Sequence, residues 1–162
     1  MLYNDNDSNL DFLREKINSI RIALFRSEFK SELHLPNNII QTLKVDDDGT
    51  VWFFTSCNGD YAKYIDRSFF ASLDYYRKGM DCRLQLSGKA NIVDTDNDGL
   101  FSMVNYPKGT YGKLVLVKIK IMQAEFFENK PVTSTDSLTD KIKSMVNHWF
   151  LAPTHRTYDF SK

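Results

Sequence analysis

The spacing of apolar residues changes along the chain, and each spacing predicts a type of element. Leu10, Leu13 and Ile17 recur at helical intervals and predict an amphipathic helix over 9–18. A polar segment after the third strand predicts a short helix over 60–68. A second helical stripe predicts a helix over 137–150, and its members are Leu138, Ile142, Met145 and Trp149.

Alternation of apolar and polar residues predicts six strands, at 20–25, 39–45, 51–55, 71–76, 82–93 and 114–127. Asp46 to Gly49 is a turn signal that joins two of them into a hairpin. Gly88 interrupts the alternation of the fifth strand as a bulge does. Consecutive, hairpin-linked strands favour a mostly β fold, an antiparallel six-stranded barrel with peripheral helices, over a parallel sheet.

Composition narrows the class of protein. The chain has 162 residues and a formal net charge of zero, which suits a single domain over 1–162, with its core at 9–127 and a C-terminal helix and tail at 131–162. Zero net charge removes the electrostatic signature of a nucleic-acid-binding protein. No apolar run approaches the ~20 residues that a membrane helix needs. Two cysteines form no disulfide framework, and the polar start is unlike a signal peptide, so we expect a cytoplasmic protein.

The segment Asp94-Thr95-Asp96-Asn97-Asp98-Gly99 matches the opening of a calcium-binding EF-hand loop. The twelfth position holds Asn105 where that loop needs glutamate, and a strand precedes the segment instead of a helix. A hairpin turn is therefore the favoured interpretation. Calcium binding by Asp94, Asp96 and Asp98 stays an alternative, as does a nucleophile pair between Cys57 and a histidine.

The third strand carries the most informative pattern. Its aromatic run leads directly into the hydroxyls of Thr55 and Ser56 and then into a turn. Backbone N–H groups of the turn, the two hydroxyls and Lys63 would together suit a phosphate group. The alternative is that the two hydroxyls cap the following helix.

Here the sequence resembles the pyridoxamine 5′-phosphate oxidase-related, FMN-binding split-barrel proteins, in particular the bacterial general-stress-protein type. The resemblance covers residues 10–127. It is carried by the segments 20–24, 45–56, 83–90, 114–119 and 124–127. The aspartate turn followed by the aromatic strand is its most specific part.

The resemblance implies a homodimer with FMN in a groove between the subunits. In such proteins the residues after the aromatic strand hold the phosphate, which falls on Thr55, Ser56 and Cys57, with Lys63 as the basic residue of the next helix. Backbone contacts to the flavin ring fall on Ile39 and Ile40. A polar side chain from the other subunit falls on Arg83. We also expect the aromatic strand 51–55 to expose apolar surface for the dimer.

The sequence departs from the family pattern at two basic positions. Asn38-Ile39-Ile40 replaces the usual Arg-Pro-Met, and Tyr61 stands where a basic residue is expected. Both changes remove charge-assisted contacts to phosphate. The expected function is an FMN-dependent oxidoreductase acting on a small molecule. The alternative is a non-catalytic dimer of the same fold that binds flavin or haem, or that has no cofactor.

Overall fold

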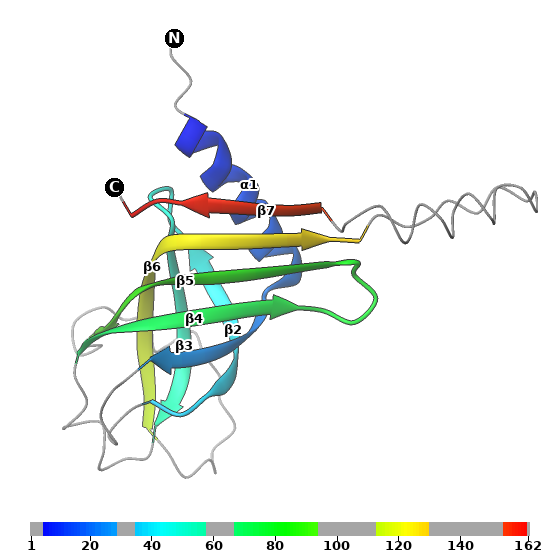
Figure 1. Ribbon diagram of the computed structural model, residues 1–162. Coiled ribbons are helices and arrows are strands. Elements are labelled where there is room, and N and C mark those ends of the chain that lie inside the picture. Colours follow the sequence, from blue (N-terminus) through cyan, green and yellow to red (C-terminus); the bar gives the residue numbers. More distant parts are fainter. Residues whose placement is uncertain (1–4, 29–34, 58–66, 94–112, 130–153, 162) are drawn as a thin grey trace, which may run out of the picture.

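The computed structural model describes residues 5–28, 35–57, 67–93, 113–129 and 154–161. One helix and seven strands lie in this part of the chain (Figure 1). They are α1 (Asp5–Ile20), β1 (Ile22–Glu28), β2 (Asn38–Val45), β3 (Thr50–Cys57), β4 (Ser68–Tyr76), β5 (Cys82–Val93), β6 (Lys113–Glu128) and β7 (Thr154–Asp159).

The strands form one antiparallel sheet in the order β3-β2-β1-β4-β5-β6-β7. An additional pairing between β3 and β6 closes the first six strands into a barrel, which confirms the predicted fold class. Strand β6 is long enough to serve two neighbours on one side. Its first half pairs with β3 and its second half, Gln123–Glu128, pairs with β7 outside the barrel.

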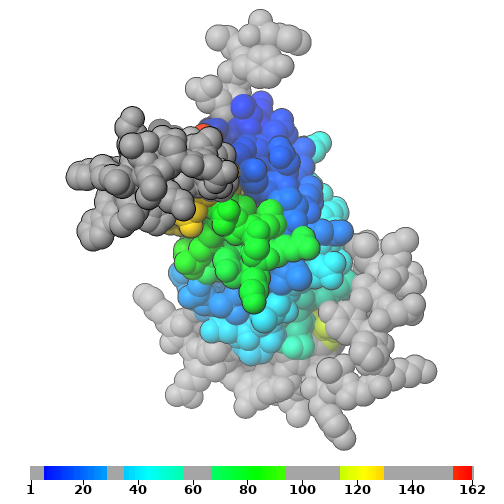
Figure 2. All heavy atoms as spheres, turned by 90° about the vertical axis from the view of Figure 1, so that its right-hand side faces the viewer, coloured from blue at the N-terminus to red at the C-terminus, as the bar shows by residue number. Residues whose placement is uncertain are grey.

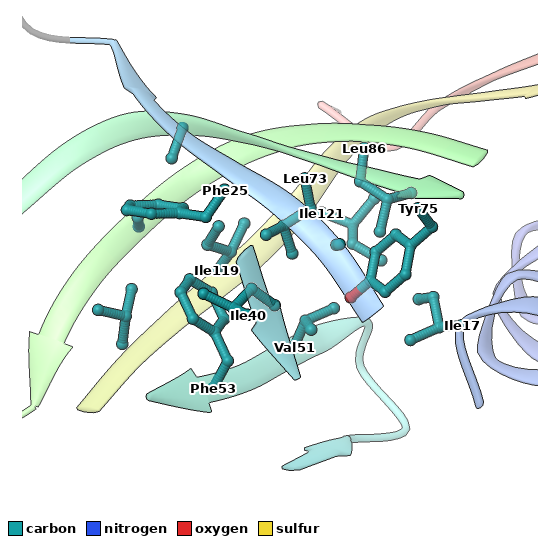
Figure 3. Packing of buried hydrophobic residues seen from close by; sticks show 14 of the residues in the cluster. Ile17, Phe25, Ile40, Val51, Phe53, Leu73, Tyr75, Leu86, Ile119 and Ile121 are labelled. Carbon is teal, nitrogen blue, oxygen red and sulfur yellow. The ribbon is translucent and has the colours of Figure 1, made fainter. Parts of the chain in front are cut away.

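The barrel interior is filled by aromatic and aliphatic side chains from every barrel strand (Figure 3). The rings of Phe25 and Phe53 meet with centroids 5.1 Å apart. Tyr75 is fully buried, and its hydroxyl lies 2.6 Å from the hydroxyl of Thr42, itself buried. This hydrogen bond satisfies two polar groups that would be costly to bury alone.

Helix α1 covers the barrel with one apolar face, since Leu13, Ile17 and Ile20 are all buried. The helix ends because Arg21 adopts a left-handed conformation, φ 64°, and its N–H donates to the Ile17 carbonyl at 2.8 Å. Such a residue terminates helices. The prediction that the first strand begins at Ile20 is therefore wrong.

The inward face of β1 is carried by Ala23 and Phe25, whereas Ile22 and Leu24 are 49% and 38% exposed. The aromatic strand β3 differs from β1, which has exposed apolar residues on its outward face. In β3, Val51, Phe53 and Phe54 are buried, and the half-buried Trp52 donates its indole N–H to Asp46 at 2.6 Å. The expectation that 51–55 exposes apolar surface to a partner is therefore wrong.

Three carboxylates of the predicted hairpin turn are held by ion pairs. Each pairs with a cation from a different element, 2.9–3.1 Å away: Lys44 with Asp46, Arg14 with Asp47, and Lys120 with Asp48. Gly49 takes φ 80°, which the turn requires of glycine. The hairpin is thus confirmed, and its turn is tied to α1 and β6.

The bulge predicted at Gly88 is placed in the wrong strand. The register with β6 does shift between Ser87 and Gly88, but the extra residue is Met122 of β6, and the alternation of β5 continues through Gly88. A Cβ on Gly88 would lie 1.9 Å from the Lys120 carbonyl oxygen, so only glycine allows this approach. Strand β4 begins at Ser68, where the sequence predicted the end of a helix.

Several predictions fall outside the described residues: the helix over 137–150, residues 60–66 of the short helix, and the candidate calcium ligands Asp94, Asp96 and Asp98. Strand β7 lies in a tail for which no element was predicted. No helix among the described residues has both the length and the apolar character needed to cross a membrane.

Candidate functional site

The candidate site lies where β2 changes its pairing partner from β1 to β3. Its first half, Asn38–Gln41, pairs with β1, and the register with β3 starts only at Thr42, opposite Phe53. Beyond that point β3 continues from Phe54 to Cys57 and pairs with β6 alone. The stretches Asn38–Gln41 of β2 and Phe54–Cys57 of β3 therefore do not pair with each other, and we call this unpaired stretch the opening.

Asn38 bridges this opening. Its Nδ2 donates to Thr55 Oγ1 at 2.9 Å and to both the carbonyl oxygen and the Oγ of Ser56, each at 3.2 Å. The structure thus brings together the two hydroxyls that the sequence assigned to a phosphate group. It adds an amide that sequence reasoning recorded only as a missing arginine.

The two hydroxyls differ in exposure. Thr55 is buried, whereas Ser56 is exposed. Among the described residues no lysine or arginine hydrogen-bonds to either one, so the cradle formed by Asn38, Thr55 and Ser56 is neutral. Hydroxyl donors match the acceptor oxygens of a phosphate monoester, so this donor set fits the phosphate of FMN through hydrogen bonds without a fixed positive charge.

The neighbouring residues of β2 point in opposite directions. Ile39 is 78% exposed, and Ile40 lies in the core at 3% (Figure 3). Both keep their backbone at the opening, as backbone contact to a flavin ring requires. The Ile39 side chain is exposed on the outer face of β2, opposite to the face that Asn38 and Ile40 share.

Of the other predicted binding residues, the structure places Arg83 away from the cradle. Cys57 is the last residue of β3, opposite Lys113, and Lys63 lies outside the described residues. Arg83 sits opposite Phe127, near the far end of β6 from Val115, the partner of Thr55. The register therefore does not bring Arg83 to the cradle of its own chain.

Arg83 belongs to a charge cluster on the outer face of the barrel. Its Nε donates to Asp74 at 2.8 Å, and Arg26 donates to the same carboxylate at 3.2 Å. The hydrogen bond and the charge of Asp74 raise the pKa of Arg83 above its usual value. Two guanidinium groups on one carboxylate leave this cluster with a net positive charge.

An apolar stripe on the same outer face was missed by sequence reasoning. Its exposed members are Ile22, Leu24, Ile39, Leu43 and Tyr76. The register places Leu24 between Ile39 on β2 and Asp74 on β4. Figure 2 shows the β4–β5 hairpin, in green, sharing one face of the molecule with α1 and β2. Because alternation gives no direction, the sequence could not say that these residues face outward.

Solved structures with the same fold are found across nearly the whole chain. A protein from Clostridium acetobutylicum, related to general stress protein 26 of Bacillus subtilis and placed in the pyridoxinephosphate oxidase family, has TM-score 0.58 and 12% identity, covering 95% of this chain and 96% of its own. A protein from Jannaschia sp. assigned to general stress protein 26 has TM-score 0.56 and 15% identity, covering 94% and 99%.

A third structure is the general stress FMN/FAD-binding protein of Xanthomonas citri. It has TM-score 0.54 and 18% identity, covering 79% of this chain and 93% of its own. No family model matches the sequence, and no curated protein gives a significant sequence match. At these identities the likeness shows the fold. The chain therefore has the split-barrel fold of the general stress protein 26 and pyridoxine phosphate oxidase group, as the sequence resemblance implied.

Proposed function

We propose that this protein binds FMN at the opening between β2 and β3. The observation that carries the proposal is the cradle of Asn38, Thr55 and Ser56. In it the amide at the start of β2 hydrogen-bonds to the two hydroxyls near the end of β3. The Xanthomonas citri structure, which shares the fold, is of an FMN/FAD-binding protein. In this arrangement Thr55 and Ser56 contact the phosphate, and the backbone of Ile39 and Ile40 borders the flavin ring.

Bound FMN would supply electron transfer, and the protein would position it and exclude water. We propose that the holoprotein is an oxidoreductase that acts on a small molecule in the cytoplasm. The chain's own contribution is to hold the phosphate at the cradle and to place the ring against the backbone of Ile39 and Ile40.

We further propose that the working form is a homodimer, joined across the outer apolar stripe. That stripe begins at Ile39, so the dimer contact adjoins the cradle. Arg83, which the register does not bring to the cradle of its own chain, lies beside this stripe opposite Tyr76 on β4. A second copy would bring its Arg83 toward the neutral cradle.

A second candidate is a dimer of the same fold that binds haem or has no cofactor. It is favoured by one observation, the neutral amide of Asn38 at a position where the resemblance implies an arginine. Hydrogen bonds from charged donors to phosphate are about twice as strong as neutral ones, so a site without them holds FMN less firmly.

The two candidates are separated by a visible absorption spectrum of purified protein, before and after addition of FMN and desalting. Retained flavin bands support the first, and their absence in both samples supports the second. The variant Thr55→Val with Ser56→Ala should lose the bands. The control Ser87→Ala with Thr157→Val removes two hydroxyls elsewhere, on β5 and β7, and should retain them.

A further inference from the structure

We propose that Asn38 is the residue that sets the ligand specificity of the cradle, by fixing the direction of its hydrogen bonds so that the site prefers FMN to riboflavin. This inference rests on the proposed function, because it concerns the same opening. It gives a function to Asn38, which the sequence marks only as a departure from the family pattern.

The orientation of the Asn38 amide follows from one neighbour. The Ser56 carbonyl oxygen, 3.2 Å from Nδ2, can only accept a hydrogen bond. Placing Oδ1 there would bring two acceptors together with no hydrogen between them. The amide nitrogen must therefore face β3, and its two hydrogens are shared among this carbonyl and the hydroxyl oxygens of Thr55 and Ser56, so that one of them is bifurcated.

The direction of these bonds decides what the hydroxyls offer. A hydroxyl has one hydrogen and two lone pairs, and here a lone pair of each oxygen is taken by Asn38. Among the described residues neither hydroxyl has an acceptor for its own hydrogen. Ser56 presents its hydroxyl at the surface, whereas Thr55 lies behind it, buried. The group that such hydrogens suit is rich in acceptors and poor in donors.

A phosphate monoester has this character. Its terminal oxygens are acceptors and carry charge, so hydrogen bonds to them are shorter and stronger than bonds between neutral groups. The terminal ribityl hydroxyl of riboflavin is itself a donor and gains less from the same cradle. The ratio of the dissociation constants for the two flavins therefore reports the direction of the hydrogen bonds in the cradle, because the flavin ring contributes equally to both ligands.

The test compares dissociation constants for FMN and riboflavin in wild-type protein and two variants. Asn38→Leu keeps the shape but removes the donors, and Asn38→Asp replaces the donor with an acceptor that the hydroxyls turn toward. We expect the preference for FMN to fall several-fold in Asn38→Leu, which no longer holds the hydroxyl hydrogens toward the phosphate, and about tenfold or more in Asn38→Asp, which draws them away from it. Riboflavin affinity should change less than about twofold.

Two controls separate this role from others. Asn91→Asp makes the same charge change on β5, opposite Lys118 and away from the opening, and should leave the preference unaltered. Adding Thr55→Val and Ser56→Ala to Asn38→Leu should abolish the remaining preference for FMN, because the hydroxyls that bind the phosphate are then gone. Retained riboflavin binding shows that each variant is folded.

The outcomes distinguish the inference from the function on which it rests. Wild-type protein that binds neither flavin overturns the proposed function, and the inference with it. Wild-type protein that prefers FMN, with the same preference in Asn38→Leu and Asn38→Asp, overturns the inference alone. Equal losses for both flavins assign Asn38 a structural role and overturn it as well.

Discussion

At the scale of single residues, the barrel depends on one buried polar pair. The Tyr75 hydroxyl and Thr42 Oγ1 lie 2.6 Å apart inside an apolar core. Burial raises the pKa of Tyr75, so the phenol stays neutral. Tyr75→Phe should leave the Thr42 hydroxyl unsatisfied and lower the free energy of unfolding by about 1–3 kcal/mol, measured by urea denaturation.

The double variant Tyr75→Phe with Thr42→Val checks the cause of that loss. Removing both polar partners leaves no unsatisfied group, so the double variant should be more stable than the sum of the two single losses predicts. Strict additivity would show that the pair contributes nothing and that the losses come from packing alone.

Single residues also set the limit of what the sequence predicts. Alternation correctly gives a strand through Ala23 and Leu24, but alternation is equally satisfied by either face. Phe25 faces inward because the left-handed Arg21 fixes how the chain leaves α1. A backbone angle of this kind has no residue-type signal when the residue is arginine, so the face could not be predicted.

At the scale of elements, the close approach of β5 to β6 depends on Gly88. A Cβ at this position would lie 1.9 Å from the Lys120 carbonyl oxygen, and backbone cannot move aside as a flexible side chain can. Gly88→Ala should therefore lower the unfolding free energy by about 3 kcal/mol or prevent folding. Ser87→Ala, its neighbour, should change thermal stability little. Equal melting temperatures for wild type and Gly88→Ala would contradict this.

The β2–β3 turn should make the stability of the protein depend on pH in the acidic range. The hydrogen bond from Lys120 lowers the pKa of Asp48 below its ordinary value of 3.8. A carboxyl with a lowered pKa stabilises the fold above its unfolded-state pKa, and this contribution is lost as pH falls through the folded-state pKa. Asp48 and Lys120 are both about half exposed, so the contribution is about 0.5–1 kcal/mol.

Asp48→Asn should therefore lower unfolding free energy at pH 7, and the difference from wild type should vanish once the pH is below the lowered pKa. Urea denaturation at both pH values measures it. Asp81→Asn, which removes an exposed carboxylate with no ion pair among the described residues, should show no such difference. A gap between wild type and Asp48→Asn that persists in acid would contradict the assignment.

The sequence predicts a helix or strand correctly where the pattern of its own side chains is enough to define it. The β2–β3 hairpin and the apolar face of β6 both follow from local patterns. Strand β7 does not, because its residues are mostly exposed and its pairing with Gln123–Glu128 supplies the order. For the same reason Thr55 and Ser56 could be named from sequence, whereas the opening and the bridge from Asn38 depend on where β2 changes partner.

At the scale of the whole molecule, the closed barrel gives a physical reason to propose a ligand site where β2 and β3 do not pair. A closed barrel has no free edge, so its backbone groups are used in the sheet. The opening is the one place among the described barrel strands where β2 and β3 lie next to each other in sheet order without pairing. Backbone and hydroxyl groups there are available to a ligand, and the exposed stripe starts beside them.

The stripe itself makes the last prediction. Contiguous exposed apolar residues with a polar rim mark interfaces, and here Arg26, Asp74 and Arg83 supply the rim. A two-fold dimer uses the same surface on both copies, so a single substitution acts twice. Leu24→Glu, at the centre of the stripe between Ile39 and Asp74, should convert a dimer into a monomer.

Light scattering coupled to size exclusion measures this directly. Wild-type protein should have twice the mass of one 18.8 kDa chain, and Leu24→Glu should have the mass of one. Thr157→Glu, which adds the same charge on β7, should remain dimeric. If Arg83 of a second copy faces the cradle, Leu24→Glu should also weaken FMN binding, because the charge-assisted contact is lost with the partner. A monomeric wild type would contradict the interface, and FMN retained by that monomer would show that the cradle of Asn38, Thr55 and Ser56 binds the cofactor without a partner.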